Sequence, residues 1–433
     1  MLLQKIGCFS NEMIFTKIVW LFSRFSDGLR ACLFYYNNFL KDLQKEVKKK
    51  KKCGRMVVTS QVGLIPERKR NRKTGSYSLK QQRKGVFFMQ TIQMLKTLCQ
   101  APGVSGAEEK ALEAAEQICK ELGECSRTVH KSLVCEVMAP EQGRPHLLLD
   151  AHIDEIGLTV THIEKDGFLR VAQCGGVDRR LVMASPVVVH TENGDFPGVI
   201  EGKPEYLQSG EKKNPKLDEI WVDVGMSGEE ATEKIALGSK ITFVGDFTEL
   251  ENGRVSSKAL DDRCCCAAII KAAEQIKAYW KENHLEPMGL TVLLSSQEET
   301  GGLGALTAAF SVCPTHAIVV DVTFGTTPEI ADKHCGDLNK GPMVGMGAVL
   351  SRRMARDLIA AGKEEQIPHQ IEAMGGGGTG TNADGIVKAA QGVETCCVSI
   401  PLRYMHTPIE TIAVEDVDNT ANLIAAYAKK IGR

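Results

Sequence analysis

Two adjacent carboxylates, Glu298 and Glu299, follow a predicted strand in this 433-residue chain. The strand is an apolar, β-prone run over residues 290–294, and glycines and a helical pattern over 302–310 come after the acidic pair. The carboxyl ends of strands in an open α/β sheet form the ligand crevice. Two glutamates are costly to bury there unless a positive group meets them. Taken alone, such a pair is more often a solvated acidic loop.

Histidine and acidic residues also stand at the ends of other predicted strands and helices. These residues are His152, Asp154, Asp261, Asp321 and His406. Each one alone has an ordinary explanation, such as a helix N-cap for Asp261 or a solvated loop for His406. Several such donors at one edge of a sheet instead indicate a metal site. Imidazoles mixed with carboxylates suit a pair of divalent metal ions such as zinc or cobalt.

The spacing of two of these donors is informative. His152 and Asp154 lie two residues apart at the end of the predicted strand 146–151. Side chains two apart on an extended chain point to the same side, so the carboxylate could orient the imidazole. Asp261 opens a predicted helix over 261–280, where the helix dipole favours a negative charge.

The elements that must position these residues alternate between apolar strands and amphipathic helices. Strands are predicted at 134–138, 146–151, 290–294, 317–322 and 395–400, and helices at 90–100, 107–122, 261–280, 302–310, 351–361, 382–390 and 414–431. This alternation predicts an α/β fold with a mainly parallel sheet that helices cover on both faces. Ser105 and Glu108 predict a capping box at the start of the helix over 107–122.

Residues 158–244 have a different character. Short predicted strands separated by turn glycines fill this segment, with one short helix at 228–235. The pattern predicts a small β domain inserted into the catalytic chain, which would then consist of residues 89–157 and 245–433. The insertion separates His152 from Asp261 and contributes none of the candidate donors.

Residues 1–88 carry 20 lysines and arginines against 5 acidic residues, whereas the remainder of the chain carries 33 against 49. The segment contains no uncharged run long enough to span a bilayer and no signal-peptide pattern. A basic tail that binds a membrane surface or nucleic acid is one interpretation. We instead expect residues 1–88 to be an artefact of the gene model, with translation starting at Met89, or to be disordered.

Charge and cysteine content narrow the class of protein further. The acidic balance after residue 88 argues against nucleic acid as the main partner. The chain has 15 cysteines but no CxxC pair, and the runs at 264–266 and 396–397 are contiguous. Contiguous cysteines do not face one another, so they predict small buried residues rather than a metal or disulfide framework. A thiol-rich chain of this kind is typical of the reducing cytoplasm.

The motifs around the candidate donors resemble those of a known family, the TET-type dodecameric metallo-aminopeptidases. This family includes glutamyl and deblocking aminopeptidases, and some of its members are called cellulase M. The motifs are AHIDEIG at 151–157, KALDDR at 258–263, SQEE at 296–299, DV at 321–322 and SIPLRYMH at 399–406. PGVIEGKP at 197–204 and IWVDVG at 220–225 resemble the family's inserted domain. The resemblance runs in order from about Met89 to the C-terminus.

The resemblance implies an α/β domain of the zinc-peptidase type with two divalent metal ions. Zinc or cobalt is expected, with manganese as the alternative. It implies that His152 and Asp321 bind one ion, that Glu299 and His406 bind the other, and that Asp261 bridges the two.

The same resemblance assigns the remaining roles. Glu298 would be the general base, Asp154 would orient His152, and the peptide bond between Asp261 and Asp262 would be cis. One stretch departs from the family. TGGLGA at 300–305 lacks a basic residue that is common in relatives, which leaves the substrate preference open.

We therefore expect a cytoplasmic aminopeptidase that removes N-terminal residues from short peptides. The resemblance implies a homo-oligomer, a dodecamer built from dimers that the inserted domain pairs, with no nucleic-acid or membrane partner. A glycoside hydrolase is the alternative enzyme, but two carboxylates would suffice for it and the histidines would have no role. A non-catalytic assembly protein is the alternative from another class.

Overall fold

The computed structural model describes residues 90–180, 182–203, 216–285, 288–328, 330 and 335–431. The expectation for residues 1–88 concerns a segment outside these described residues. Part of the predicted inserted domain, residues 204–215, also lies outside them.

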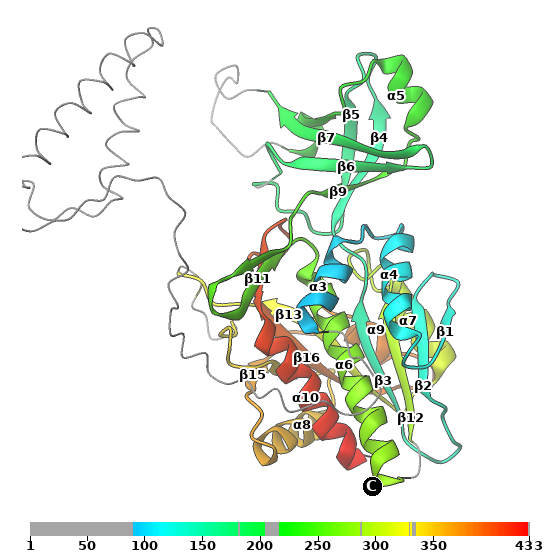
Figure 1. The fold of residues 1–433 in the computed structure, drawn as a ribbon, viewed down its shortest axis with the longest axis vertical. Helices are drawn as coiled ribbons and strands as arrows, with labels where there is room; N and C mark the ends of the chain where they lie inside the picture. The colour runs from blue at the N-terminus through cyan, green and yellow to red at the C-terminus, as the bar shows by residue number, and fades with distance from the viewer. Residues whose placement is uncertain are drawn as a thin grey trace, which may run out of the picture. The chain divides into compact units, whose positions relative to one another are not determined.

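An eight-stranded sheet forms the centre of the fold (Figure 1). Its strands, in spatial order, are β1 (Glu124–Arg127), β2 (Leu133–Met138), β12 (Gly289–Ser295), β3 (His146–His152), β13 (His316–Phe324), β16 (Glu394–Leu402), β14 (Met343–Met346) and β15 (Gln370–Ala373). The four central strands β12, β3, β13 and β16 are parallel to one another. Their carboxyl ends therefore lie along the same edge of the sheet.

The flanks of the sheet are not parallel to its centre. Strands β1 and β2 form an antiparallel pair, β2 also runs antiparallel to β12, and β14 runs antiparallel to β16. The sheet is therefore mixed, whereas the sequence predicted a mainly parallel one. The reason is local on one side, because β1 and β2 are joined by a short turn and a short turn can only connect antiparallel strands.

Helices cover both faces of this sheet. They are α3 (Thr91–Gln100), α4 (Glu109–Cys119), α6 (Leu260–Asn283), α7 (Leu303–Val312), α8 (Arg352–Glu364), α9 (Ala383–Ile386) and α10 (Val414–Ile431). On β13, Ile318 and Val320 belong to the core that includes α6 and α10, whereas Ala317 and Val319 belong to the core that includes α7 and α9. Burial on both faces explains why the central strands are continuously apolar in the sequence.

A closed six-stranded barrel is inserted between β3 and the later elements. Its strands are β4 (Gly157–Ile163), β5 (Leu169–Cys174), β6 (Pro186–Thr191), β7 (Gly194–Gly202), β8 (Ile220–Asp223) and β9 (Lys240–Phe243). Pairing of β4 with β9 closes the ring and brings together the points where the chain enters and leaves it. The barrel encloses its own cluster of buried apolar residues and carries one helix, α5 (Gly228–Lys234).

A small antiparallel sheet near the strand ends was absent from the prediction. It consists of β10 (Thr248–Leu250), β11 (Arg254–Ser257) and β17 (Glu410–Ala413). Strand β11 leads directly into α6, and β17 follows the loop after β16. The pairing of Ser257 with Glu410 therefore ties the start of α6 to that loop.

The predicted capping box at the start of α4 is wrong. The helix begins at Glu109, and its N-cap residue Glu108 has no side-chain capping bond. The Ser105 hydroxyl instead lies 2.8 Å from the hydroxyl of Thr300, and Glu108 accepts a hydrogen bond from the Gly106 N–H at 2.6 Å. The Ser105 hydroxyl thus makes a long-range contact with Thr300 instead of the helix-capping bond that the local pattern predicted.

Within the described residues, no helix is both long enough and apolar enough to cross a membrane.

Candidate metal centre

The candidate donors come from four neighbouring strands and one helix. His152 ends β3, Asp321 lies near the end of β13, and Glu298 and Glu299 follow β12. His406 stands in the loop after β16, and Asp261 lies in the first turn of α6. Since the four strands are parallel, all these side chains meet at the carboxyl edge of the sheet. The structure thus brings together every residue that the sequence singled out.

One group of donors surrounds His152. The ligand atoms of His152, Asp261, Asp262 and Asp321 all lie within 4.8 Å of one another. The His152 Nε2 is 3.1 Å from Asp261 Oδ1, and all four side chains are buried. This arrangement suits a small cation with nitrogen and oxygen ligands.

A second group shares one residue with the first. The ligand atoms of Asp261, Glu299 and His406 also lie within 4.8 Å of one another. The His406 Nε2 is 3.5 Å from Asp261 Oδ2 and 3.5 Å from Glu299 Oε1. The two oxygens of Asp261 therefore face different histidines, so this carboxylate belongs to both groups of donors.

Asp262 was not among the predicted donors. Its Oδ2 accepts a hydrogen bond from the backbone N–H of His152 at 3.1 Å, and its Oδ1 has no hydrogen-bond partner among the described residues. The Asp261–Asp262 peptide bond is cis, as the family resemblance implied. No role was predicted for the Asp262 side chain, although it belongs to the first group of donors.

Glu298 lies beside the donors without joining either group. Its Oε2 is 4.0 Å from His152 Nε2, and 17% of its side chain is exposed. Burial raises the pKa of Glu298, and the charge of His152 partly offsets this effect. Glu298 is next to the donors but is not one of them. A carboxylate in this position with a raised pKa can accept and release a proton at the centre.

Asp154 holds the segment that carries the two glutamates. Its carboxylate accepts the backbone N–H of Glu298 at 3.0 Å and that of Glu299 at 3.1 Å. The Nδ1 of His152 is 3.2 Å from the Asp154 carbonyl oxygen and 3.4 Å from its carboxylate. One buried aspartate therefore contacts three residues of the centre.

Glu410 holds a second pair and was missed by the sequence analysis. Its Oε2 accepts the backbone N–H of Asp261 at 2.9 Å, and its Oε1 accepts that of His406, also at 2.9 Å. The side chain is buried. It lies four residues after His406 in the chain, which was the one available sign that it belongs to the site.

The centre gathers several buried carboxylates, and a bound cation would stabilise their negative charge. Burial raises the pKa of Glu299 to about 8, with the charge of Asp261 adding to the effect, and burial likewise raises the pKa of Asp321. For His406, burial by itself lowers the pKa. The hydrogen bond to Asp261 and the charge of Glu299 outweigh this effect and raise the pKa of His406 to about 9. The nearby Lys258 does not neutralise the acids, since its Nζ lies 2.7 Å from Glu155. Divalent cations would compensate this buried negative charge, so the donor set fits them.

The barrel supplies part of the wall around the second group. A Cβ atom on Gly176 would lie 2.6 Å from the His406 Nδ1, and one on Gly175 would lie 2.9 Å from the Glu299 Oε2. Such distances are shorter than any ordinary contact. The turn after β5 can therefore approach His406 and Glu299 this closely only because residues 176 and 175 are glycines.

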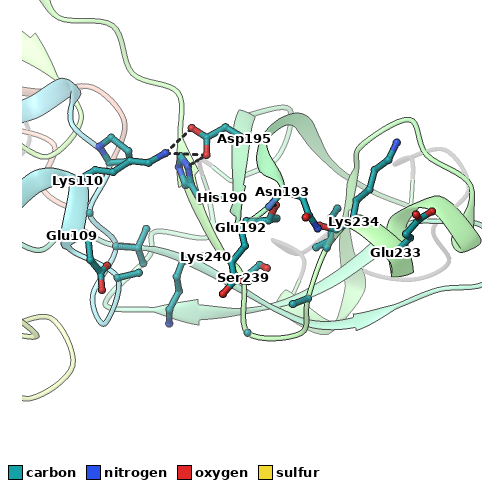
Figure 2. A pocket seen from close by; sticks show the side chains of 18 of the residues that line it. Glu109, Lys110, His190, Glu192, Asn193, Asp195, Glu233, Lys234, Ser239 and Lys240 are labelled. Atoms are coloured by element: carbon teal, nitrogen blue, oxygen red, sulfur yellow. Dashed lines mark hydrogen bonds and ion pairs between the residues drawn. The ribbon is translucent and has the colours of Figure 1, made fainter.

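A large cavity lies elsewhere, between the segment 102–110 and the barrel, with a volume of about 620 Å³. Figure 2 shows Lys110 pointing from α4 toward Asp195 of the barrel, with its Nζ 2.9 Å from that carboxylate. His190, the cross-strand neighbour of Asp195, places its Nδ1 2.8 Å from the same carboxylate. None of the candidate donors lines this cavity. We take the donor cluster as the candidate site, because mixed imidazole and carboxylate groups converge there and none of them lines this cavity.

Comparison with known proteins identifies a family of peptidases. Residues 132–423 match the family model described as M42 glutamyl aminopeptidase. A lysyl aminopeptidase from Pyrococcus furiosus is 33% identical over 345 residues, which cover 78% of this chain and 97% of that protein.

Solved structures are similar too. An aminopeptidase from the archaeon Desulfurococcus kamchatkensis has a TM-score of 0.71 at 31% identity, covering 78% of this chain and 94% of its own. The TET1 peptidase of Pyrococcus horikoshii, described as able to assemble into a tetrahedron or a large octahedral shell, has a TM-score of 0.68 at 31% identity, with 78% and 99% covered.

Proposed function

Since the chain belongs to the M42 glutamyl aminopeptidase family and is a metal-dependent aminopeptidase, we propose that it removes N-terminal residues from short peptides with two divalent cations. The observation that carries the two-cation proposal is the position of Asp261. Its Oδ1 faces His152 and its Oδ2 faces His406, so it belongs to both donor groups.

The ligands divide between the two groups accordingly. We assign His152 and Asp321 to one cation, Glu299 and His406 to the other, and Asp261 to both. The Oδ2 of Asp262 already accepts the His152 N–H, so we assign Asp262 to the support of that histidine. The ligand set of a zinc-peptidase-type domain suits zinc or cobalt, with manganese as the alternative.

Glu298 is the general base of the proposed reaction. Bound divalent cations lower the pKa of water and polarise the peptide carbonyl. The Glu298 carboxylate accepts the proton of the attacking water and returns it to the leaving amine, a contribution of about 10²–10⁴-fold in rate. Asp154 keeps the Glu298 backbone in place through the N–H bond described above.

Neither alternative from the sequence gains support from the site. A glycoside hydrolase needs two carboxylates and leaves His152 and His406 without a role. A non-catalytic assembly protein would not need the full set of buried donors that the carboxyl edge of the sheet carries.

We further propose that the chain acts as a homo-oligomer, a dodecamer built from dimers, in which the β domain over 158–244 pairs subunits of the catalytic part. The support is the relative described as forming a tetrahedron or octahedral shell. The cysteines of the described residues are free thiols, which supports a cytoplasmic location. Short peptides are the expected partners, without nucleic acid or membrane.

The test is a metal-reconstitution screen. The full-length protein is stripped with a chelator, reloaded with zinc, cobalt or manganese, and assayed on a panel of aminoacyl-p-nitroanilides and on a cellulosic substrate. We expect peptide-type activity that disappears with the metal and returns on reloading. Activity on the sugar substrate that survives the chelator would overturn the proposal.

A further inference from the structure

We propose that Glu410 is a positioning residue that fixes the spacing between the bridging carboxylate of Asp261 and the imidazole of His406. This inference rests on the proposed two-cation function. Glu410 touches neither cation nor substrate, and it acts through the backbone of two residues that do. Its two carboxylate oxygens accept the N–H groups of Asp261 and His406, each at 2.9 Å.

Glu410 is itself firmly placed. It begins β17, and its backbone pairs with Ser257 at the end of β11, immediately before the turn that delivers Asp261. The side chain is buried, and both oxygens are engaged by backbone donors. A carboxylate that accepts backbone N–H groups away from water makes charge-assisted hydrogen bonds, which are stronger than those between neutral groups.

The His406 loop needs such a support. His406 has a backbone φ of +62° and Tyr404 a φ of +63°, a left-handed conformation that is uncommon and unfavourable for non-glycine residues. The hydrogen bond from the His406 N–H to Glu410 is a direct restraint on this conformation. Without it, the backbone would relax and the imidazole would move relative to Asp261 Oδ2, which is now 3.5 Å away.

Two buried acids thus divide the support of the centre between them. Asp154 accepts the N–H groups of Glu298 and Glu299, whereas Glu410 accepts those of Asp261 and His406. Loss of Glu410 should therefore weaken mainly the cation of the second group, because two of its three ligands depend on this residue. The first group keeps His152 and Asp321 as independent ligands.

The experiment measures metal binding without substrate. Glu410→Gln in the full-length protein replaces one acceptor oxygen by an NH₂ group, so the side chain can accept only one of the two backbone N–H groups. We expect elemental analysis after dialysis to show the loss of about one of two cations, and calorimetric titration with zinc to show at least about a tenfold weaker second site, in the range measured for residues that support metal ligands. The kcat for a p-nitroanilide substrate should fall more than its KM rises.

Asp416→Asn is a matched control. Asp416 is equally buried and also accepts two backbone N–H groups, those of Asn339 and Gly341, both at 2.7 Å, but it contacts no donor of the centre. This variant should lower the melting temperature and leave both zinc sites unchanged. If Glu410→Gln does not fold, Glu410→Asp is measured, since it keeps the charge but is too short to reach both N–H groups.

The outcomes separate the two proposals. Wild-type zinc affinity at both sites in a folded Glu410 variant, or an equal loss of zinc in Asp416→Asn, would overturn the positioning role. A wild-type protein that binds two cations but cleaves no aminoacyl substrate would overturn the proposed function and leave the role of Glu410 standing.

Discussion

Gly176→Ala should weaken metal binding by the second group of donors, although residue 176 is not a ligand. The added Cβ would lie 2.6 Å from the His406 Nδ1 and 2.8 Å from its Cε1. An ordinary contact to a Cβ begins at about 3.4 Å, so the imidazole or the turn must move by about 0.8 Å. Metal–ligand distances tolerate only about 0.2 Å of error.

The expected cost follows from that displacement. A misplacement of about 1 Å can cost about 100-fold in rate, and a disturbed ligand support costs about 10–100-fold in metal affinity. Gly176→Ala should therefore bind the second zinc at least about tenfold more weakly in calorimetric titration, with a matching loss of kcat. Gly377 is a suitable control, because a Cβ there meets no atom within 4 Å.

Gly377→Ala should behave like the wild type in both assays. Unchanged zinc affinity and kcat in Gly176→Ala would show that the turn after β5 yields easily, and the argument that the barrel turn shapes the site would fail. Equal losses in the two glycine variants would point to a general effect of the substitutions rather than to contact with His406.

Three further perturbations have distinct outcomes. Glu298→Gln should keep both cations and lose about 10²–10⁴-fold in kcat; turnover near that of the wild type, with metal content measured on the same sample, would refute the assignment of the base. Burial raises the pKa of Glu274 to about 7 from 4.5, so its ionisation destabilises the fold as pH rises through that window. At about 1.36 kcal/mol per pKa unit, halved for partial exposure, Glu274→Gln should stabilise the protein by about 1–2 kcal/mol at pH 8 and by almost nothing at pH 4, as measured by urea unfolding. A benefit at both pH values would contradict this cause. Replacing residues 158–244 by a short Gly/Ser bridge should give smaller assemblies of reduced activity in sedimentation, and unchanged assemblies would exclude the barrel as the pairing element.

The central strands and the donors could be predicted because their causes are local in the sequence. A strand buried on both faces, such as β13, must be a continuous apolar run. The residues just after such runs, like His152 and Glu299, are polar because they reach the open edge of the sheet. A single sequence is enough to see both patterns.

Other features depend on contacts that no local pattern records. All three residues of β10 are exposed, so the strand has no apolar alternation to reveal it. Glu410 looks like an ordinary acid in a loop, because the groups that it binds include the N–H of Asp261, which is distant in the chain. Ser105 fits a capping box, but its hydroxyl contacts the hydroxyl of Thr300, in the segment after β12, instead of the helix.

The way in which the centre is assembled also bears on how the chain folds. His152 and His406 lie near opposite ends of the catalytic sequence, with the whole barrel and most of the large sheet between them. Contacts of such sequence separation close large loops and are among the slowest to form. The two groups of metal ligands should therefore form late in folding, after β3, β12, β13 and β16 have paired. Enzyme activity recovered after dilution from denaturant would then lag behind the return of helical circular dichroism.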